Sequence, residues 1–316
     1  MADSIGSFPF WSGFLIVVIL LLSLDLGLFH RKAHSVGMRE ALVWTITWVS
    51  LSLLFGAYLY THRGHQKGLE FFTGYLIEYA LSVDNVFVFI VLFNYFAVPA
   101  RLHHRVLFWG ILGALIMRAT FILVGAALLE AFHWIIYVFG AFLVFTGWKI
   151  LRQEATEIDP DRNPVVRLFQ RFVPLVSGYE SEHFFVKKAG RRFATPLALV
   201  LVTVETTDLV FAVDSIPAIF AVSRDPFIVY TSNVCAILGL RSMYFLLAAV
   251  MGRFVYLSTG LGIVLIFVGA KMLVSHYYTI PIGLSLAIVA AVLIGSVVIS
   301  LLFPPVINSK NESSGG

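Results

Sequence analysis

The chain has 316 residues, of which 59% are hydrophobic and only 13% are charged, whereas a soluble domain has about 25% charged residues. With a mean hydropathy of +0.90, too few charged side chains remain to cover a soluble surface, which excludes a soluble globular protein and a disordered one. The net charge of +4 is explained by basic loops on one side of a membrane, so we expect no nucleic-acid partner.

Hydrophobic runs follow one another along the chain, and each is long enough to cross a bilayer as a helix. They lie near residues 10–29, 41–60, 70–96, 106–129, 133–151, 196–221, 228–250, 257–275 and 281–303. The first run is followed, not preceded, by basic residues, so it is not a cleavable signal peptide. We therefore predict an all-α polytopic membrane protein with about nine transmembrane helices and the lipid bilayer as its partner.

Loop charge predicts the direction of the helices. If the N-terminus lies outside, the outer loops contain only Arg63, Lys67 and Arg224 among the basic residues, and most other Lys and Arg residues fall in inner loops. This asymmetry favours an outside N-terminus and a cytoplasmic C-terminus. The long inner loop 152–195 has mixed charge and three prolines, and we expect a short amphipathic helix near 164–172. A connector and a partner-binding segment both remain open for this loop.

Two segments of the chain resemble each other. The first reads EYALSVDNVF from Glu78, and the second reads DLVFAVDSIP from Asp208. Their alignment pairs Asp84 with Asp214, and further along it pairs Arg118 with Arg241 and Lys149 with Lys271. Since each copy covers three spans, the second copy enters the membrane from the opposite side. Inverted repeats of this kind are common in secondary transporters, with a site near the midplane where the copies meet.

These observations divide the chain into five parts: two N-terminal spans over 1–69, a first three-helix repeat over 70–151, a cytoplasmic loop over 152–195, a second, inverted three-helix repeat over 196–275, and a ninth span with its tail over 276–316.

Ionisable residues lie deep in the predicted spans. They are the acids Asp25, Glu78, Asp84, Glu205, Asp208 and Asp214 and the bases Arg118 and Arg241. Each such residue at a helix centre costs roughly 2.5–3.5 kcal/mol, so a use for them is expected. The two arginines can neutralise only two carboxylates. The others are protonated and hydrogen-bonded between helices, face water, or bind a cation.

The spacing of the acids adds detail. Glu205 and Asp208 share a helix face, whereas Asp208 and Asp214 are about 240° apart on an unbroken helix. Pro217 predicts a break near 213–217 that turns Asp214 toward Asp208. Asn85 and Ser215 add neutral oxygen ligands next to the two aspartates, and no Cys or His lies close by. Such oxygen chemistry favours Mn²⁺, Mg²⁺ or Ca²⁺ without choosing among them.

The same motifs resemble the TerC family of membrane proteins, and its Alx branch in particular. The resemblance is carried by GYLIEYALSVDNVFVF from Gly74, FAVDSIPAIFAVSRDPFIVYTSN from Phe211, AILGLRSMYFLLA from Ala236, SLDLGLFHRKAH from Ser23 and EHFFVKKAG in the long loop. It implies a bacterial inner-membrane protein of metal homeostasis, in a family named for tellurium resistance. For the Alx branch it implies manganese export. The acidic motif residues of the family fall on Glu78, Asp84, Asn85, Asp208 and Asp214, with Asp25 on the first span.

We therefore expect a secondary transporter that exports Mn²⁺, with proton exchange as a weaker hypothesis. Asp84, Asp208 and Asp214 are expected to bind the ion, assisted by Asn85 and Ser215, while Glu78 and Asp25 complete the site or carry protons. Arg118 and Arg241 are expected to pair with acids when no ion is bound. The role of Glu205 stays open.

Two other classes compete with a transporter. A membrane scaffold or biogenesis factor would act through protein partners and would depend on the loop 152–195. An intramembrane protease could use paired aspartates as a dyad, but Asp84 and Asp214 lie beside Asn and Ser in repeat-related positions. We expect no enzyme activity and no resident cofactor, with Mn²⁺ as cargo, and the sequence leaves the oligomeric state open.

Overall fold

A computed structural model describes residues 5–29, 37–132, 134–152, 164–174, 176, 179, 183–188, 191–248, 256–275, 277–278 and 280–303. The side chains at 24–29, 84, 164, 172, 188, 191 and 214 lie outside this description, although the backbone there is helical or extended.

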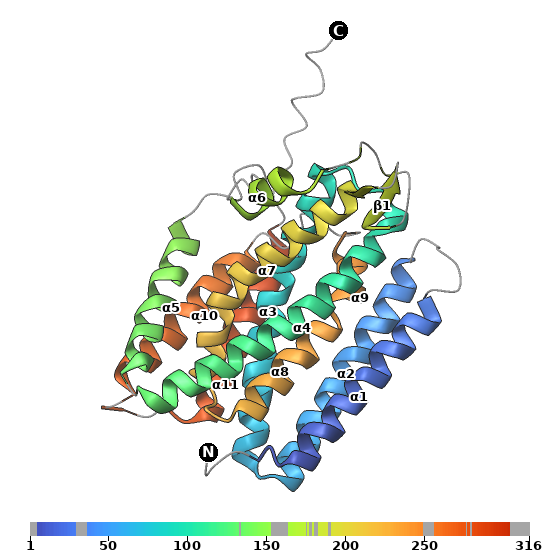
Figure 1. Ribbon diagram of the computed structural model, residues 1–316. Helices are drawn as coiled ribbons and strands as arrows, with labels where there is room; N and C mark the ends of the chain where they lie inside the picture. The colour runs from blue at the N-terminus through green and yellow to red at the C-terminus, as the bar shows by residue number, and fades with distance from the viewer. Residues whose placement is uncertain are drawn as a thin grey trace.

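The chain is a bundle of long apolar helices (Figure 1). They are α1 (Phe8–Phe29), α2 (Met38–His62), α3 (His65–Tyr95), α4 (Ala100–Ala131), α5 (Ile135–Arg152), α7 (Pro196–Phe220), α8 (Pro226–Leu238), α9 (Leu240–Ala248), α10 (Leu257–Val274) and α11 (Ile282–Leu302). Among the described residues, eight segments are long and apolar enough to span a membrane, with α8 and α9 counted as one, and Phe8–Ser23 is a shorter apolar helix. A helix satisfies its backbone groups within a single segment inside hydrocarbon, which explains why the hydrophobic runs take this form. The fold is therefore an all-α polytopic membrane protein, and the count of nine spans stays a prediction.

Two of the expected helix features differ in the structure. The run 228–250 is divided at Gly239, where α8 ends and α9 begins. Conversely, the break expected near 213–217 is wrong, because α7 continues as a helix through Pro217 to Phe220. Positions 208 and 214 therefore stay about 240° apart around α7. A proline inside a membrane helix is tolerated when its neighbours satisfy the freed backbone group.

The loop 152–195, which we call the connector, contains more regular structure than the sequence predicts. The amphipathic helix expected near 164–172 is confirmed as α6 (Pro164–Phe172). A hairpin of β1 (Phe185–Lys188) and β2 (Arg191–Ala194) was not expected, and its antiparallel register pairs Phe185 with Ala194. The Tyr179 hydroxyl donates to the carbonyl of Phe96 at 2.8 Å, at the turn between α3 and α4. Burial raises the pKa of Tyr179 to about 12, so this donor stays protonated up to strongly alkaline pH.

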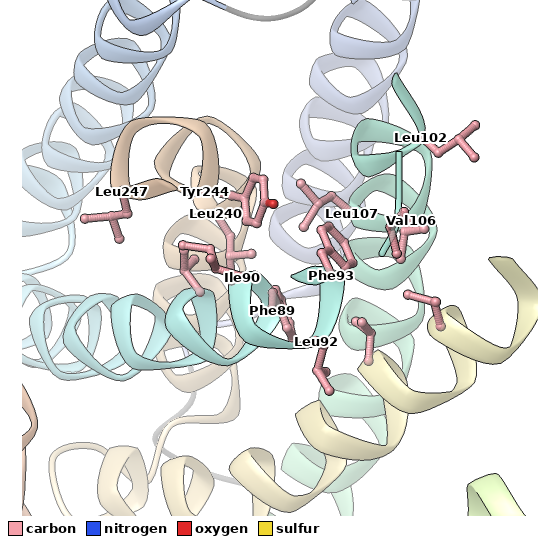
Figure 2. Close-up of a cluster of buried hydrophobic side chains, with 14 of the residues drawn as sticks. Phe89, Ile90, Leu92, Phe93, Leu102, Val106, Leu107, Leu240, Tyr244 and Leu247 are labelled. Carbon is pink, nitrogen blue, oxygen red and sulfur yellow. The ribbon is translucent and has the colours of Figure 1, made fainter. Parts of the chain in front are cut away.

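Helix α3 lies at the centre of the bundle, because it packs against α2, α7, α8, α9, α10 and α11. One large apolar cluster forms where α3, α4 and α9 meet, and Figure 2 shows Phe93 of α3 close to Leu107 of α4 and Tyr244 of α9. The start of α1 and the α6 helix lie at opposite ends of the bundle (Figure 1). The bundle therefore has two distinct ends, and only one of them is covered by the connector.

Helices α5 and α10 approach each other so closely that glycines are needed at the contact. A Cβ atom added at Gly147 would lie 2.5 Å from the carbonyl oxygen of Gly262, and one at Gly140 would lie 2.9 Å from that of Gly269. In the repeat alignment Gly140 corresponds to Gly262, and Gly147 to Gly269. Each glycine thus contacts the counterpart of the other, as a two-fold relation between the copies would require. The inverted repeat stays a prediction that this contact supports.

Candidate functional site

Three charged side chains meet in the interior of the bundle, one each from α3, α4 and α7. Arg118 of α4 is 1% exposed, and Glu78 of α3 is fully buried. The guanidinium of Arg118 donates from Nη2 to Oδ1 of Asp208 at 3.2 Å and from Nε to Oδ2 at 3.4 Å. Its Nη1 forms an ion pair with Oε1 of Glu78. One arginine fork therefore joins two buried carboxylates that belong to different copies of the predicted repeat.

Two neutral residues complete this cluster, which we call the Arg118 cluster: Glu78, Asn85, Arg118, Asp208 and Ser215. The Asn85 amide donates to Oδ1 of Asp208 at 3.5 Å, and Nη1 of Arg118 donates to the Ser215 hydroxyl at 3.3 Å. Asn85 and Ser215 are counterparts in the repeat. The regular period of α3 and α7 places Glu78 with Asn85, and Asp208 with Ser215, on one helix face, seven residues apart.

The charge of the cluster does not balance when both carboxylates are ionised, because two negative groups face one guanidinium. A net negative charge in a low-dielectric interior favours the entry of a cation or a proton. The oxygens of Glu78, Asp208, Asn85 and Ser215 are ligands that suit a hard cation. Within the described part of the chain, no group of three or more His, Cys, Asp and Glu side chains is arranged to hold a metal ion. In this structure the guanidinium of Arg118 lies between the carboxylates of Glu78 and Asp208.

Several buried polar atoms have no hydrogen-bond partner. Among the described residues, these atoms include Oε2 of Glu78, Oγ of Ser82 on α3, and both amide atoms of Asn233 on α8. All three residues are fully buried. The sequence pattern did not predict Ser82 and Asn233 as site residues, although Ser82 lies one helical turn after Glu78 within the repeated motif. Such atoms are rare in native interiors, so they mark places where a ligand or water can bind.

The remaining predicted residues are Glu205, Arg241, Asp25, Asp84 and Asp214. Glu205 lies on α7 against Gly113 of α4, where an added Cβ would collide with the carboxyl group. Arg241 is buried on α9. The side chains of Asp25, Asp84 and Asp214 lie outside the described residues. The structure thus brings together five of the predicted residues, and their roles stay predictions.

A second charged network, in which the carboxylates are buried, lies at the end of the bundle where α3 begins, and the sequence pattern did not predict it. Lys67 lies 3.3 Å from Oε2 of Glu70 and 3.4 Å from Oδ2 of Asp225. The Ser223 hydroxyl donates to Glu70 at 2.6 Å, and the backbone N–H of Ile5 donates to Asp225 at 2.9 Å. Asp225 also caps the N-terminus of α8. This network therefore fastens the N-terminal segment to α3 and to the turn between α7 and α8.

The sequence matches the model of a known protein family, described as "Integral membrane protein TerC family", over residues 63–311. The chain belongs to the TerC family. The match covers α3 to α11, which include the whole Arg118 cluster. It also confirms the resemblance that the repeated acidic motifs indicated.

Full-length relatives of this TerC protein are known. A Myxococcus xanthus protein named "Uncharacterized membrane protein STKORF319" is 52% identical over 95% of this chain and 94% of its own length. Proteins of Salmonella typhi and Escherichia coli strain K12, both named "Putative membrane-bound redox modulator Alx", are 49% and 48% identical. They cover 94% of this chain and 95% and 96% of their own lengths. No solved structure matches the chain.

These findings place the chain among integral multi-pass membrane proteins with bacterial relatives. The expectation that the protein has no enzyme activity stays a prediction.

Proposed function

We propose that this TerC protein is a secondary transporter that exports a divalent cation from the cytoplasm, with Mn²⁺ as its cargo. The observation that carries the proposal is the Arg118 cluster, in which two buried carboxylates from α3 and α7 share one guanidinium. Charged groups inside a membrane are expensive, and they mark ion or proton paths in membrane proteins. The cluster also lies between helices of the two predicted repeat copies, where transporters bind their substrates.

Arg118 acts as a tethered cation in the ion-free state. A divalent ion that enters the cluster brings two positive charges, and it competes with the guanidinium for Glu78 and Asp208. Protons can compete for the same carboxylates, so exchange of cytoplasmic Mn²⁺ for external protons follows from the same chemistry. Asp84, Asp214 and Asp25 remain proposed ligands or proton carriers on the same helices as the cluster or on α1.

Export requires a direction, and we propose that the connector with α6 and the β-hairpin faces the cytoplasm. The basic residues of the chain concentrate in that connector, as the bias of cytoplasmic loops requires. The protein would then lie in a bacterial inner membrane, with its N-terminus outside and its C-terminus inside.

The relatives from Salmonella typhi and Escherichia coli are named as redox modulators, and we relate that role to the metal. This chain has one cysteine, Cys235, so an intrachain dithiol cannot carry redox chemistry here. Control of a redox-active ion such as Mn²⁺ would link transport to the redox state of the cell without a reactive thiol.

The proposal is tested by the manganese content of cells that lack their own Mn²⁺ exporters. We expect the wild-type protein to lower cellular manganese, and we expect Asp208→Asn and Asp84→Asn to lose this effect at equal expression. Glu130→Gln is the matched control, because Glu130 is exposed at the end of α4. If Asp208→Asn and Asp84→Asn lower manganese as well as the wild type does, the proposed site is wrong.

A further inference from the structure

Among the buried serine and threonine hydroxyls on the described membrane helices, only that of Ser82 has no hydrogen-bond partner. On the described spanning helices, Thr45, Ser52, Thr73, Thr203, Thr231, Ser232, Ser242, Ser285, Ser296 and Ser300 are buried, and each donates to a carbonyl three or four residues earlier. This local bond is the ordinary way to satisfy a hydroxyl in hydrocarbon. Ser82 is fully buried and does not make it. The Ser82 hydroxyl is therefore held in the interior without a partner.

A second unpartnered atom lies one helical turn away. Oε1 of Glu78 pairs with Arg118, whereas Oε2 has no partner and is fully buried. Residues four apart on a helix share a face, with Cβ atoms about 5–6 Å apart. Two oxygens on such neighbouring side chains can reach the same small cation, whose bonds to oxygen are about 2.0–2.6 Å long. Oε2 of Glu78 and the Ser82 hydroxyl are thus two unpartnered ligand atoms on one face of α3.

The free-energy penalty of burying these two atoms without partners indicates that they bind a ligand. A buried polar atom without a partner destabilises a protein, and an alanine at position 82 would remove that cost. The second repeat copy has such a residue, because Ala212 of α7 is the counterpart of Ser82 and is also buried. The fold therefore accepts alanine at the matching place, and the hydroxyl is present in the first copy only.

From these observations we propose that the Ser82 hydroxyl is a ligand of the transported cation, which it binds together with Oε2 of Glu78. The inference rests on the proposed cation transport and adds to it a ligand outside the acidic motif positions. It also makes the site asymmetric, because the cation binds nearer to α3 than to α7. A hydroxyl is a hard ligand, so Ser82 contributes to the preference for Mn²⁺ over softer ions such as Cd²⁺.

The test is a binding titration of the purified full-length protein in detergent, with Mn²⁺ alone as the probe and the EPR signal of free Mn²⁺ as the measurement. We expect Ser82→Ala to raise the dissociation constant about tenfold, since one charge-assisted contact is lost. Its thermal stability without metal should equal or exceed that of the wild type. Ser82→Cys should shift the preference toward Cd²⁺, because a thiolate is a soft ligand.

Ser296→Ala is the matched control, because Ser296 is a buried serine of α11 that donates to the carbonyl of Val292 at 2.8 Å. Its Mn²⁺ affinity should equal that of the wild type. If Ser82→Ala binds Mn²⁺ as tightly as the wild type does, and Ser82→Cys leaves the ion preference unchanged, the role of Ser82 is overturned while transport stands. If the wild-type protein itself shows no saturable Mn²⁺ binding, both the Ser82 ligand and the proposed function are overturned.

Discussion

Arg118 is the residue on which the interior of this protein depends most directly. Its planar guanidinium contacts Asp208 through two nitrogens and Glu78 through a third. A lysine ammonium is a compact point charge and cannot reproduce this fork. The interaction also joins α4 to both α3 and α7. Arg118 therefore balances charge and positions three helices at the same time.

Replacing Arg118 tests how much the protein is destabilised when the buried carboxylates lose their counter-ion. We expect Arg118→Met to lower the stability of the detergent-purified protein by about 3–5 kcal/mol, because it leaves two buried carboxylates without a counter-ion. The triple variant with Glu78→Gln and Asp208→Asn should recover most of the loss. Thermal unfolding followed by circular dichroism measures both effects. A single variant as stable as the wild type would show that the carboxylates are already neutral.

Individual site residues were predictable to different degrees. Glu78, Asp208 and Arg118 could be predicted, because charge inside an apolar run is visible in the sequence. Ser82 and Asn233 could not, because a hydroxyl or amide without a partner results from tertiary packing and has no local signal. The Lys67 network was missed because Glu70 and Asp225 lie near the ends of spans, where charge is ordinary. Pro217 misled the prediction, since α7 accommodates it without a break.

At the scale of elements, the two glycine contacts between α5 and α10 set the distance between two helices that belong to different copies of the predicted repeat. The carbonyl oxygens of Gly262 and Gly269 occupy the space that side chains at Gly147 and Gly140 would need. Small residues that allow backbones to approach closely are a common means of helix association in membranes, where the hydrophobic effect does not drive it. The two glycine contacts therefore form a close α5–α10 interface between the predicted repeat copies.

A larger side chain in the α5–α10 interface should push the two helices apart. We expect Gly147→Leu to lower stability by about 1–3 kcal/mol through overpacking. Gly295→Leu on α11 should have little effect, because no atom lies within 4 Å of an added Cβ there. Thermal unfolding of the two variants in the same detergent makes the comparison. Equal melting temperatures would contradict the close contact between α5 and α10.

The positions of the membrane helices could be predicted closely from the hydrophobic runs in the sequence. The predicted runs and the observed helices agree within six residues at their ends, because hydrocarbon thickness and backbone hydrogen bonding leave little choice. The division at Gly239 and the β-hairpin were not predicted. Both are short features that hydropathy averages over, and neither is required by the membrane.

At the scale of the whole molecule, the bundle combines a central helix, a buried charged cluster and two different ends. Helix α3 carries Lys67 and Glu70 at its start and Glu78, Ser82 and Asn85 further along. If the proposed function holds, this helix lines the path of the cation. In the proposed orientation, the network of Lys67, Glu70, Ser223 and Asp225 lies at the outer end, and the connector lies at the inner end.

Flux through the purified protein tests this account most directly. The full-length chain in proteoliposomes, with a Mn²⁺ indicator inside and an imposed pH gradient, reports transport without other proteins. We predict Mn²⁺ movement that accelerates when protons move in the opposite direction, and that falls to the level of protein-free vesicles in Asp208→Asn. Mn²⁺ flux equal to that of protein-free vesicles under either gradient would contradict a transporter and would favour a scaffold that needs partners.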